Sequence, residues 1–295
     1  MWIARPVAGG HRVLADRMAV TRLGRDVDAA GRFAPASVAR TLEALKRFVA
    51  EARGHDARIA AVGTSALRDA SNAETLLKPA RRDLGLEIEI ISGLREAELT
   101  FAGALGGLGV DAQRATVVDI GGGSTELVRR GEQGLSLASL DIGAVRLTER
   151  HGLSAPTNAA QCEAVVEAAD AALADSPVRP RPPLIATAGT ATTLAAIARG
   201  VEPYDPAAIH GVRLPLDEIE ALVERIAPLD LHSRSLIPGL PRERADVIVA
   251  GALILARVCR AAGASEARIS DGGLRIGLGL EIMEESPIDP TSGSE

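Results

Sequence analysis

The sequence has no long hydrophobic run and very few aromatic or cysteine residues. Of its 295 residues, 2% are aromatic and two are cysteine. The apolar runs are only a few residues long, whereas a membrane-spanning helix needs roughly 20 apolar residues. The N-terminal stretch MWIARPVAGGHRVL also has no apolar core of the signal-peptide kind. We therefore expect a soluble cytoplasmic protein with no membrane partner.

An excess of basic residues is absent as well. The formal net charge is −6, and strong nucleic-acid binders usually present a basic face or aromatic stacking platforms. We therefore expect no nucleic-acid partner. A polyanionic small ligand would have to be bound by local donors at one site, not by the overall charge.

The two cysteines, Cys162 and Cys259, lie in stretches rich in alanine and valine, with helical spacing. This setting is typical of buried free thiols. A disulfide is not expected in the cytosol, and two cysteines with no nearby histidine do not indicate a zinc site.

Apolar residues make up 46% of the sequence, which is enough for substantial cores. Strands and helices alternate along the chain, so the fold class is α/β. A glycine-rich break, GGLG, predicts two domains, residues 1–110 and 111–295. The strands of 115–142, joined by short turns, should form an antiparallel meander. Ser37 is a candidate N-cap for the first long helix, and the tail from residue 286 is expected to be disordered. Strands are predicted at 59–62, 88–91, 115–120, 125–129, 135–142, 184–187 and 267–270, and helices at 38–52, 72–84, 95–105, 144–151, 158–174, from 189, at 242–262 and after the final DGGLR.

The stretch VVDIGGGSTELV, residues 117–128, ends a strand in glycines flanked by carboxylates. Glycines allow a tight turn and a close approach of a ligand to the backbone. Asp119 and Glu126 are hard oxygen ligands of the kind that Mg²⁺ takes. A structural hairpin explains the glycines about equally well. The candidate phosphate donors are the backbone and hydroxyl groups of Gly121, Gly122, Gly123, Ser124 and Thr125.

Two further stretches follow predicted strand ends. In ISGLREAEL, Glu96 opens a helix, where it either complements the helix dipole or acts as a general base for a water molecule. In GTSALRDA, Arg68 either pairs with a surface carboxylate or holds a phosphate through two parallel bonds. The stretches ATAGTATT and ISDGGLR fit tight packing as well as ligand binding.

Taken in order, these motifs resemble those of the exopolyphosphatase and guanosine-pentaphosphate phosphohydrolase family. The resemblance runs from about Arg22 to about Glu284, and the pairing of DIGGGSTE with ISG plus a glutamate carries it. It implies the two-domain fold of the actin, hexokinase and Hsp70 superfamily, with an active site in the cleft between domains. Such folds often dimerise, so a homodimer is possible.

The resemblance also implies roles for residues at matching positions. Glu96 matches the family's catalytic glutamate, and Glu126 matches a glutamate that helps to hold metal or water. Asp119 and the glycines match the phosphate loop, and Arg68 matches an arginine that follows a strand end. The implied reaction is hydrolysis of the terminal phosphoanhydride of inorganic polyphosphate or, as the close alternative, of guanosine pentaphosphate, with Mg²⁺ or another divalent cation as the cofactor.

The sequence departs from the family pattern in two places. Arg95 stands where the family's ISG-x-E-E-A motif has its first glutamate. The family's opening strand and its loop of the type D-x-G-[ST]-N-[ST] have no counterpart, so the first domain is expected to lack its first strand, and we expect the recorded start to be too late.

The missing loop leaves two other classes of function open. One is a non-catalytic protein that binds polyphosphate or an alarmone, against which the retained Glu96 and Glu126 argue. The other is a kinase of the same superfamily, in which AGTATT would be a nucleotide-binding loop. A kinase needs an intact first phosphate loop, so it ranks below the others.

Overall fold

The computed structural model describes residues 1–7, 10–19, 21, 23–24, 31–131, 134–153 and 155–285. The contacts within the chain divide it into two compact units, Met1–Leu99 with Arg275–Glu295, and Thr100–Leu274. The C-terminal helix therefore belongs to the first unit, although it is far from that unit in sequence. The domain boundary predicted at residue 110 stays a prediction. The tail from residue 286, predicted to be disordered, lies outside the described residues.

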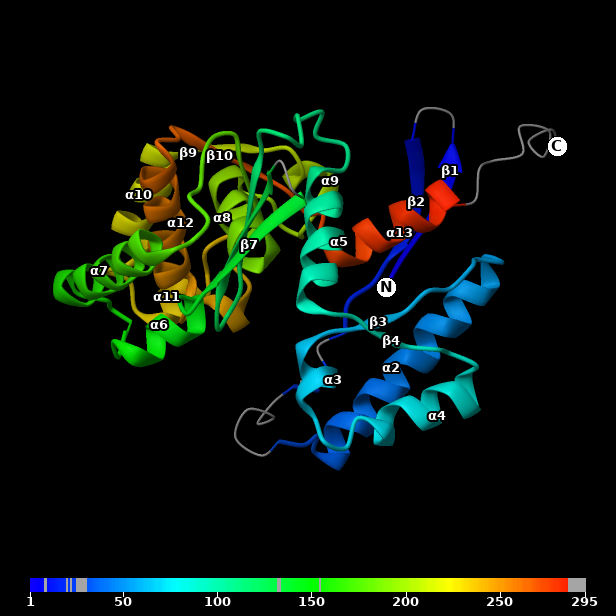
Figure 1. Ribbon diagram of the computed structural model, residues 1–295. Helices are drawn as coiled ribbons and strands as arrows, with labels where there is room; N and C mark the ends of the chain where they lie inside the picture. The colour runs from blue at the N-terminus through cyan, green and yellow to red at the C-terminus, as the bar shows by residue number, and fades with distance from the viewer. Residues whose placement is uncertain are drawn as a thin grey trace. The chain divides into compact units, whose positions relative to one another are not determined.

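The first unit carries its strands in two separate two-stranded sheets (Figure 1). Strands β1 and β2 pair in an antiparallel ladder, and β3 and β4 pair in a parallel one. The apolar segments predicted as strands at 59–62 and 88–91 thus shorten to two residues each. The bounds are β1 Trp2–Val7, β2 Gly10–Asp16, β3 Val62–Gly63 and β4 Glu89–Ile90, with helices α2 Pro35–Gly54, α3 Ser65–Asp69, α4 Glu74–Leu84, α5 Gly93–Leu105, which passes into the second unit, and α13 Leu274–Glu285.

Helix α2 corrects the predicted N-cap. The cap residue is Ala34, and Pro35 occupies the first turn, where its fixed φ suits a helix and its missing N–H costs no hydrogen bond. Ser37 lies inside the helix, buried, and its hydroxyl accepts a hydrogen bond of 2.8 Å from Arg40. The helix therefore starts at the proline, one turn of sequence before the position that the serine indicated.

The second unit is built on one six-stranded sheet in the order β7-β6-β5-β8-β10-β9. Strands β5, β8 and β10 are parallel, whereas β6, β7 and β9 run antiparallel to their neighbours. The predicted antiparallel meander is confirmed. The bounds are β5 Thr116–Ile120, β6 Thr125–Gly131, β7 Gly134–Leu140, β8 Leu184–Thr187, β9 Arg213–Pro215 and β10 Glu266–Ile269.

The helix predicted at 242–262 is shorter than expected. A 3₁₀ turn, η1 (Arg242–Arg244), precedes α12 (Ile248–Ala262), and Val247 caps α12. Helix α12 is buried on most of its surface and packs against α6, α7, α8 and α10. The other helices of this unit are α6 Ala144–Arg150, α7 Ala159–Asp175, α8 Ala188–Arg199, α9 Pro206–Ile209, α10 Leu216–Ile226 and α11 Leu231–Arg234.

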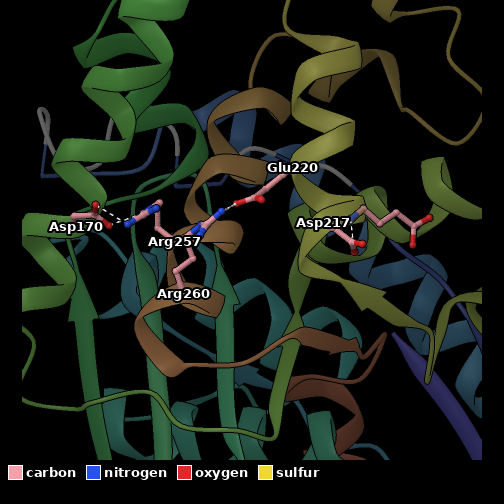
Figure 2. A network of polar contacts seen from close by, with 6 residues as sticks. Asp170, Asp217, Glu220, Arg257 and Arg260 are labelled. Carbon is pink, nitrogen blue, oxygen red and sulfur yellow. Dashed lines mark hydrogen bonds and ion pairs between the residues drawn. The ribbon is translucent and has the colours of Figure 1, made fainter.

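Two ion pairs fasten the polar edge of α12 to the helices beside it (Figure 2). Arg257 binds Asp170 of α7 through two parallel hydrogen bonds of 2.6 and 2.8 Å. Arg260 binds Glu220 of α10, with 2.8 Å between Nε and Oε1. These pairs are partly exposed, so the apolar contacts of α12 contribute more to stability than the pairs do. None of the described helices has the length and apolar character that crossing a membrane requires.

Cys259 is expected to resist thiol reagents in the folded protein. It lies fully buried on α12, and burial raises the pKa of its thiol to about 12, which suppresses the reactive thiolate. Cys162 is only partly buried, and burial raises its pKa as well. With a chromogenic disulfide reagent at about pH 7.5, we expect slow modification of Cys162 alone, accelerating as the pH rises toward the pKa of its thiol. Rapid modification of both thiols before unfolding would contradict this burial.

Candidate functional site

A pair of carboxylates lies at the end of the β5–β6 ladder in the second unit. Asp119 is directly opposite Glu126 in the antiparallel register, so both side chains project from the same face, with Cβ atoms about 5 Å apart. Ser139 of β7 donates a hydrogen bond of 2.8 Å to Oε1 of Glu126. Two like charges facing each other across a ladder destabilise it, and a bound cation relieves that repulsion.

This donor set fits a hard divalent cation. Mg²⁺ usually binds through one or two carboxylates and completes its shell with water and phosphate oxygens. In the part of the chain that the structure describes, no group of three or more histidine, cysteine or acidic side chains gathers as a metal cage. The arrangement therefore suits a metal that substrate helps to hold more than a fully enclosed structural ion.

The glycine loop that follows β5 turns its carbonyl groups toward α6. The Gly121 N–H donates to the Ser124 carbonyl at 2.9 Å, and the Gly121 carbonyl accepts from the Ala144 N–H at 3.0 Å. The Gly122 carbonyl accepts from the next two backbone amides of α6, at 2.9 Å each. Gly122 and Gly123 are exposed, and the hydrogen bonds among the described residues do not use their own N–H groups. Those two amides remain available to a phosphoryl oxygen.

Two buried residues fix the shape of this loop. Thr125 is fully buried, and its hydroxyl donates to the Ile142 carbonyl at 2.5 Å. Gly143 packs so closely that a Cβ atom there would lie 2.3 Å from the Gly122 carbonyl oxygen. The Thr125 hydroxyl, predicted as a phosphate donor, is thus directed to a protein carbonyl. Gly143 was missed, although its D-I-G at 141–143 repeats the D-I-G at 119–121.

The first unit brings Arg68 and Glu96 together. Arg68, on α3, donates from Nη1 to the Ile91 carbonyl at 2.7 Å, and the same nitrogen lies 3.3 Å from Oε2 of Glu96. Both side chains are about one-third exposed. The Ser92 hydroxyl accepts from the Arg95 N–H at 3.1 Å and so caps the first turn of α5. Glu96 is thus held at an accessible helix start, with one nitrogen of Arg68 orienting it.

The stretch AGTATT forms the first turns of α8, and its residues from Thr190 to Thr193 are buried. Arg244 of η1, which no sequence motif indicated, donates to the Gly189 carbonyl at 2.8 Å and to the Thr193 hydroxyl at 2.6 Å. A Cβ atom on Gly189 would lie 2.4 Å from the Arg244 guanidinium. Close packing therefore accounts for the small residues of this stretch.

The stretch ISDGGLR is tied to the end of β8 in a similar way. The Thr187 hydroxyl donates to the Gly272 carbonyl at 2.5 Å, and the Tyr204 hydroxyl donates to the Asp271 carboxylate. Burial and the adjoining carboxylate raise the pKa of Tyr204 well above its ordinary value. Tyr204 lies outside every motif, so only the tertiary structure reveals its link to this loop.

Comparison with known proteins gives consistent matches over most of the chain. A model of the Ppx/GppA phosphatase family matches residues 2–286. Exopolyphosphatase 2 of Mycobacterium tuberculosis is 36% identical over 277 residues, which cover 89% of this chain and 87% of that protein. Guanosine-5'-triphosphate,3'-diphosphate pyrophosphatase of Photobacterium profundum is 30% identical over 296 residues, which cover 97% of this chain and 57% of that protein.

Solved structures match at the level of the fold. The Aquifex aeolicus member of the Ppx/GppA family superimposes with a TM-score of 0.86 at 29% identity, covering 97% of this chain and 94% of that one. An exopolyphosphatase from Cytophaga hutchinsonii ATCC 33406 gives a TM-score of 0.80 at 25% identity, covering 96% and 94%. The predicted α/β fold of the actin and hexokinase type is confirmed.

Proposed function

Because the chain belongs to the Ppx/GppA phosphatase family, we propose that it hydrolyses the terminal phosphoanhydride bond of inorganic polyphosphate and releases orthophosphate. The observation that carries this proposal is the Asp119–Glu126 carboxylate pair beside a loop with two available backbone amides. Its 36% identity to an exopolyphosphatase supports polyphosphate as the substrate.

In the proposed mechanism, Glu96 accepts a proton from a water molecule that attacks the terminal phosphorus in line with the leaving oxygen. Arg68 orients the Glu96 carboxylate, and its remaining N–H groups bind a phosphate oxygen. The Gly122 and Gly123 amides and the Ser124 hydroxyl hold the phosphoryl group in the second unit. A divalent cation bound by Asp119 and Glu126 would neutralise part of the charge on the phosphoryl oxygens.

A second candidate is removal of the 5'-terminal phosphate of guanosine pentaphosphate. The match to the Photobacterium pyrophosphatase favours it, and the same carboxylates and loop would serve both reactions. A third possibility is a protein that binds these polyanions without cleaving them.

A direct assay separates these possibilities. We expect the purified chain with Mg²⁺ to release orthophosphate from a short polyphosphate, and chelation of the metal to stop the release. Replacing Asp119 by asparagine removes one of the two charges of the donor set and should lower the rate by about 100-fold. Glu163→Gln, which removes an exposed charge from α7, is the matched control and should leave the rate unchanged.

Each outcome of this assay has a distinct meaning. Faster release from guanosine pentaphosphate than from polyphosphate would replace the leading substrate by the second candidate. Tight binding of both polyanions without release of phosphate would establish the non-catalytic alternative. Equal rates for wild type and Asp119→Asn would exclude the carboxylate pair as the metal site.

A further inference from the structure

Helix α13 is fastened to the first unit along its whole length. Its first turn binds Asp16 of β2 through Arg275, its last turn binds Arg58 through Glu285 at 3.1 Å, and its middle binds Arg95 of α5 through Glu281. The Trp2 ring packs over Gly279, where a Cβ atom would lie 2.3 Å from it. Figure 1 shows α13 crossing the β1–β2 hairpin. Helix α13 is thus attached to the first unit at three places, and the ion pair in its middle, between Glu281 and Arg95, connects it to α5.

The ion pair between Arg95 and Glu281 involves the residue next to the candidate general base. Arg95 lies in the first turn of α5, directly before Glu96, and its guanidinium is shared between Glu98 on the same helix and Glu281 on α13. The resemblance to the family's ISG-x-E-E-A motif places a glutamate at this position. A glutamate here would lie beside the carboxylates of Glu98 and Glu281 and be repelled by both. The arginine instead complements the negative charge of Glu281.

We propose that Arg95 and Glu281 are positioning residues that hold the first turn of α5, and with it the Glu96 carboxylate, in register for proton transfer. This inference rests on the proposed function of Glu96. The first turn of a helix is held by few backbone hydrogen bonds, because its N–H groups have no partners within the helix. Here Ser92 caps it on one side and Arg68 holds the Glu96 carboxylate. The Arg95–Glu281 pair supplies an anchor on another side, from an element distant in sequence.

The alternative is that the pair is an ordinary partly exposed ion pair, which stabilises the fold slightly and leaves catalysis unchanged. The chain contains a matched control for this alternative. Arg58 and Glu285 join the last turn of the same helix to the segment after α2, also as an exposed pair, whereas the Arg95–Glu281 pair joins its middle to α5. If the Arg95–Glu281 pair acted only by docking α13 to the first unit, breaking either of the two ion pairs would change kcat to the same extent.

The test measures kcat and KM for phosphate release, together with the thermal midpoint, in five variants. Glu281→Gln should lower kcat by about threefold with KM nearly unchanged, because the interaction energy of the pair then no longer holds the first turn of α5 in position for proton transfer. Arg95→Glu places three carboxylates together and should lower kcat by about tenfold. The exchanged variant Arg95→Glu/Glu281→Arg should return kcat to within about twofold of wild type. Arg58→Ala and Glu285→Gln should leave kcat unchanged.

Three results would overturn the proposal: unchanged kcat in Glu281→Gln and Arg95→Glu, no recovery in the exchanged variant, or an equal loss in the Arg58 and Glu285 variants. A fall in the thermal midpoint without a change in kcat would show a purely structural pair. If the wild-type chain releases no phosphate at all, the proposed function fails first. In that case, the thermal midpoints of the same variants still show whether the two side chains are energetically coupled.

Discussion

Replacing Glu96 by glutamine is expected to lower the rate of orthophosphate release by about 10²–10⁴-fold, the usual contribution of a general base. Glutamine has nearly the same shape but its amide cannot accept the proton of the attacking water. The amide oxygen can still accept a hydrogen bond from Arg68, so the first turn of α5 should keep its structure. Binding of a short polyphosphate, measured by calorimetry with Mg²⁺ present, should therefore persist although the rate of release falls.

The competing explanation for Glu96 is stabilisation of the N-terminus of α5 by a negative charge, which contributes only about 0.3–1 kcal/mol. Glu74 provides the comparison, because it is an exposed acidic residue in the first turn of α4 in the same unit. Glu74→Gln removes a similar dipole contribution and should leave the rate of release unchanged. Wild-type activity in Glu96→Gln, or an equal loss in Glu74→Gln, would exclude Glu96 as the base.

Local patterns predicted most elements of the second unit, because its strands and helices follow their own hydrophobic periodicity. The strand LIAT at 184–187 and the meander are found as expected. The predicted secondary structure was wrong where contacts between residues distant in sequence determine the local conformation. The helix predicted from Arg242 is interrupted before Ile248, and Arg244 turns to bind Gly189 and Thr193 instead of continuing the helix.

The first unit was harder to predict because long-range contacts define it. The β1–β2 hairpin was not predicted, and its partner α13 lies more than 250 residues away in the sequence. Three side-chain pairs and the packing of Trp2 on Gly279 assign α13 to this unit. Neither periodicity nor capping residues carry information about such pairings.

The candidate site shows the same division between local and long-range information. Asp119 and Glu126 flank a short turn, so the antiparallel register that places them opposite each other follows from the sequence. Arg68 and Glu96 are 28 residues apart in the sequence, so their contact could be found only from the structure. The hydroxyl of Thr125 was assigned to phosphate because of its motif, yet burial directs it to Ile142. Its proposed contact with phosphate stays a prediction.

Gly143→Ala is expected to distort the glycine loop and to abolish most of the activity. The new Cβ atom would lie 2.3 Å from the Gly122 carbonyl oxygen and 2.4 Å from the Gly123 carbonyl carbon. Both are backbone atoms, so no flexible side chain can move aside, and the loop or α6 must shift. Overpacking of this kind costs about 1–3 kcal/mol, and a shift of about 1 Å at a phosphate-binding loop can lower a rate by about 100-fold.

The measurement pairs the rate of phosphate release with the free energy of unfolding from denaturant titration. Gly131→Ala is the matched control, because a Cβ atom at the end of β6 would meet its nearest neighbours at 3.6 Å, an ordinary contact. We expect Gly131→Ala to retain its rate, and Gly143→Ala to lose far more activity than its change in stability explains. Full activity in Gly143→Ala would mean that the geometry of the Gly122 and Gly123 peptide groups does not govern catalysis, and the phosphate-binding role of this loop would have to be abandoned.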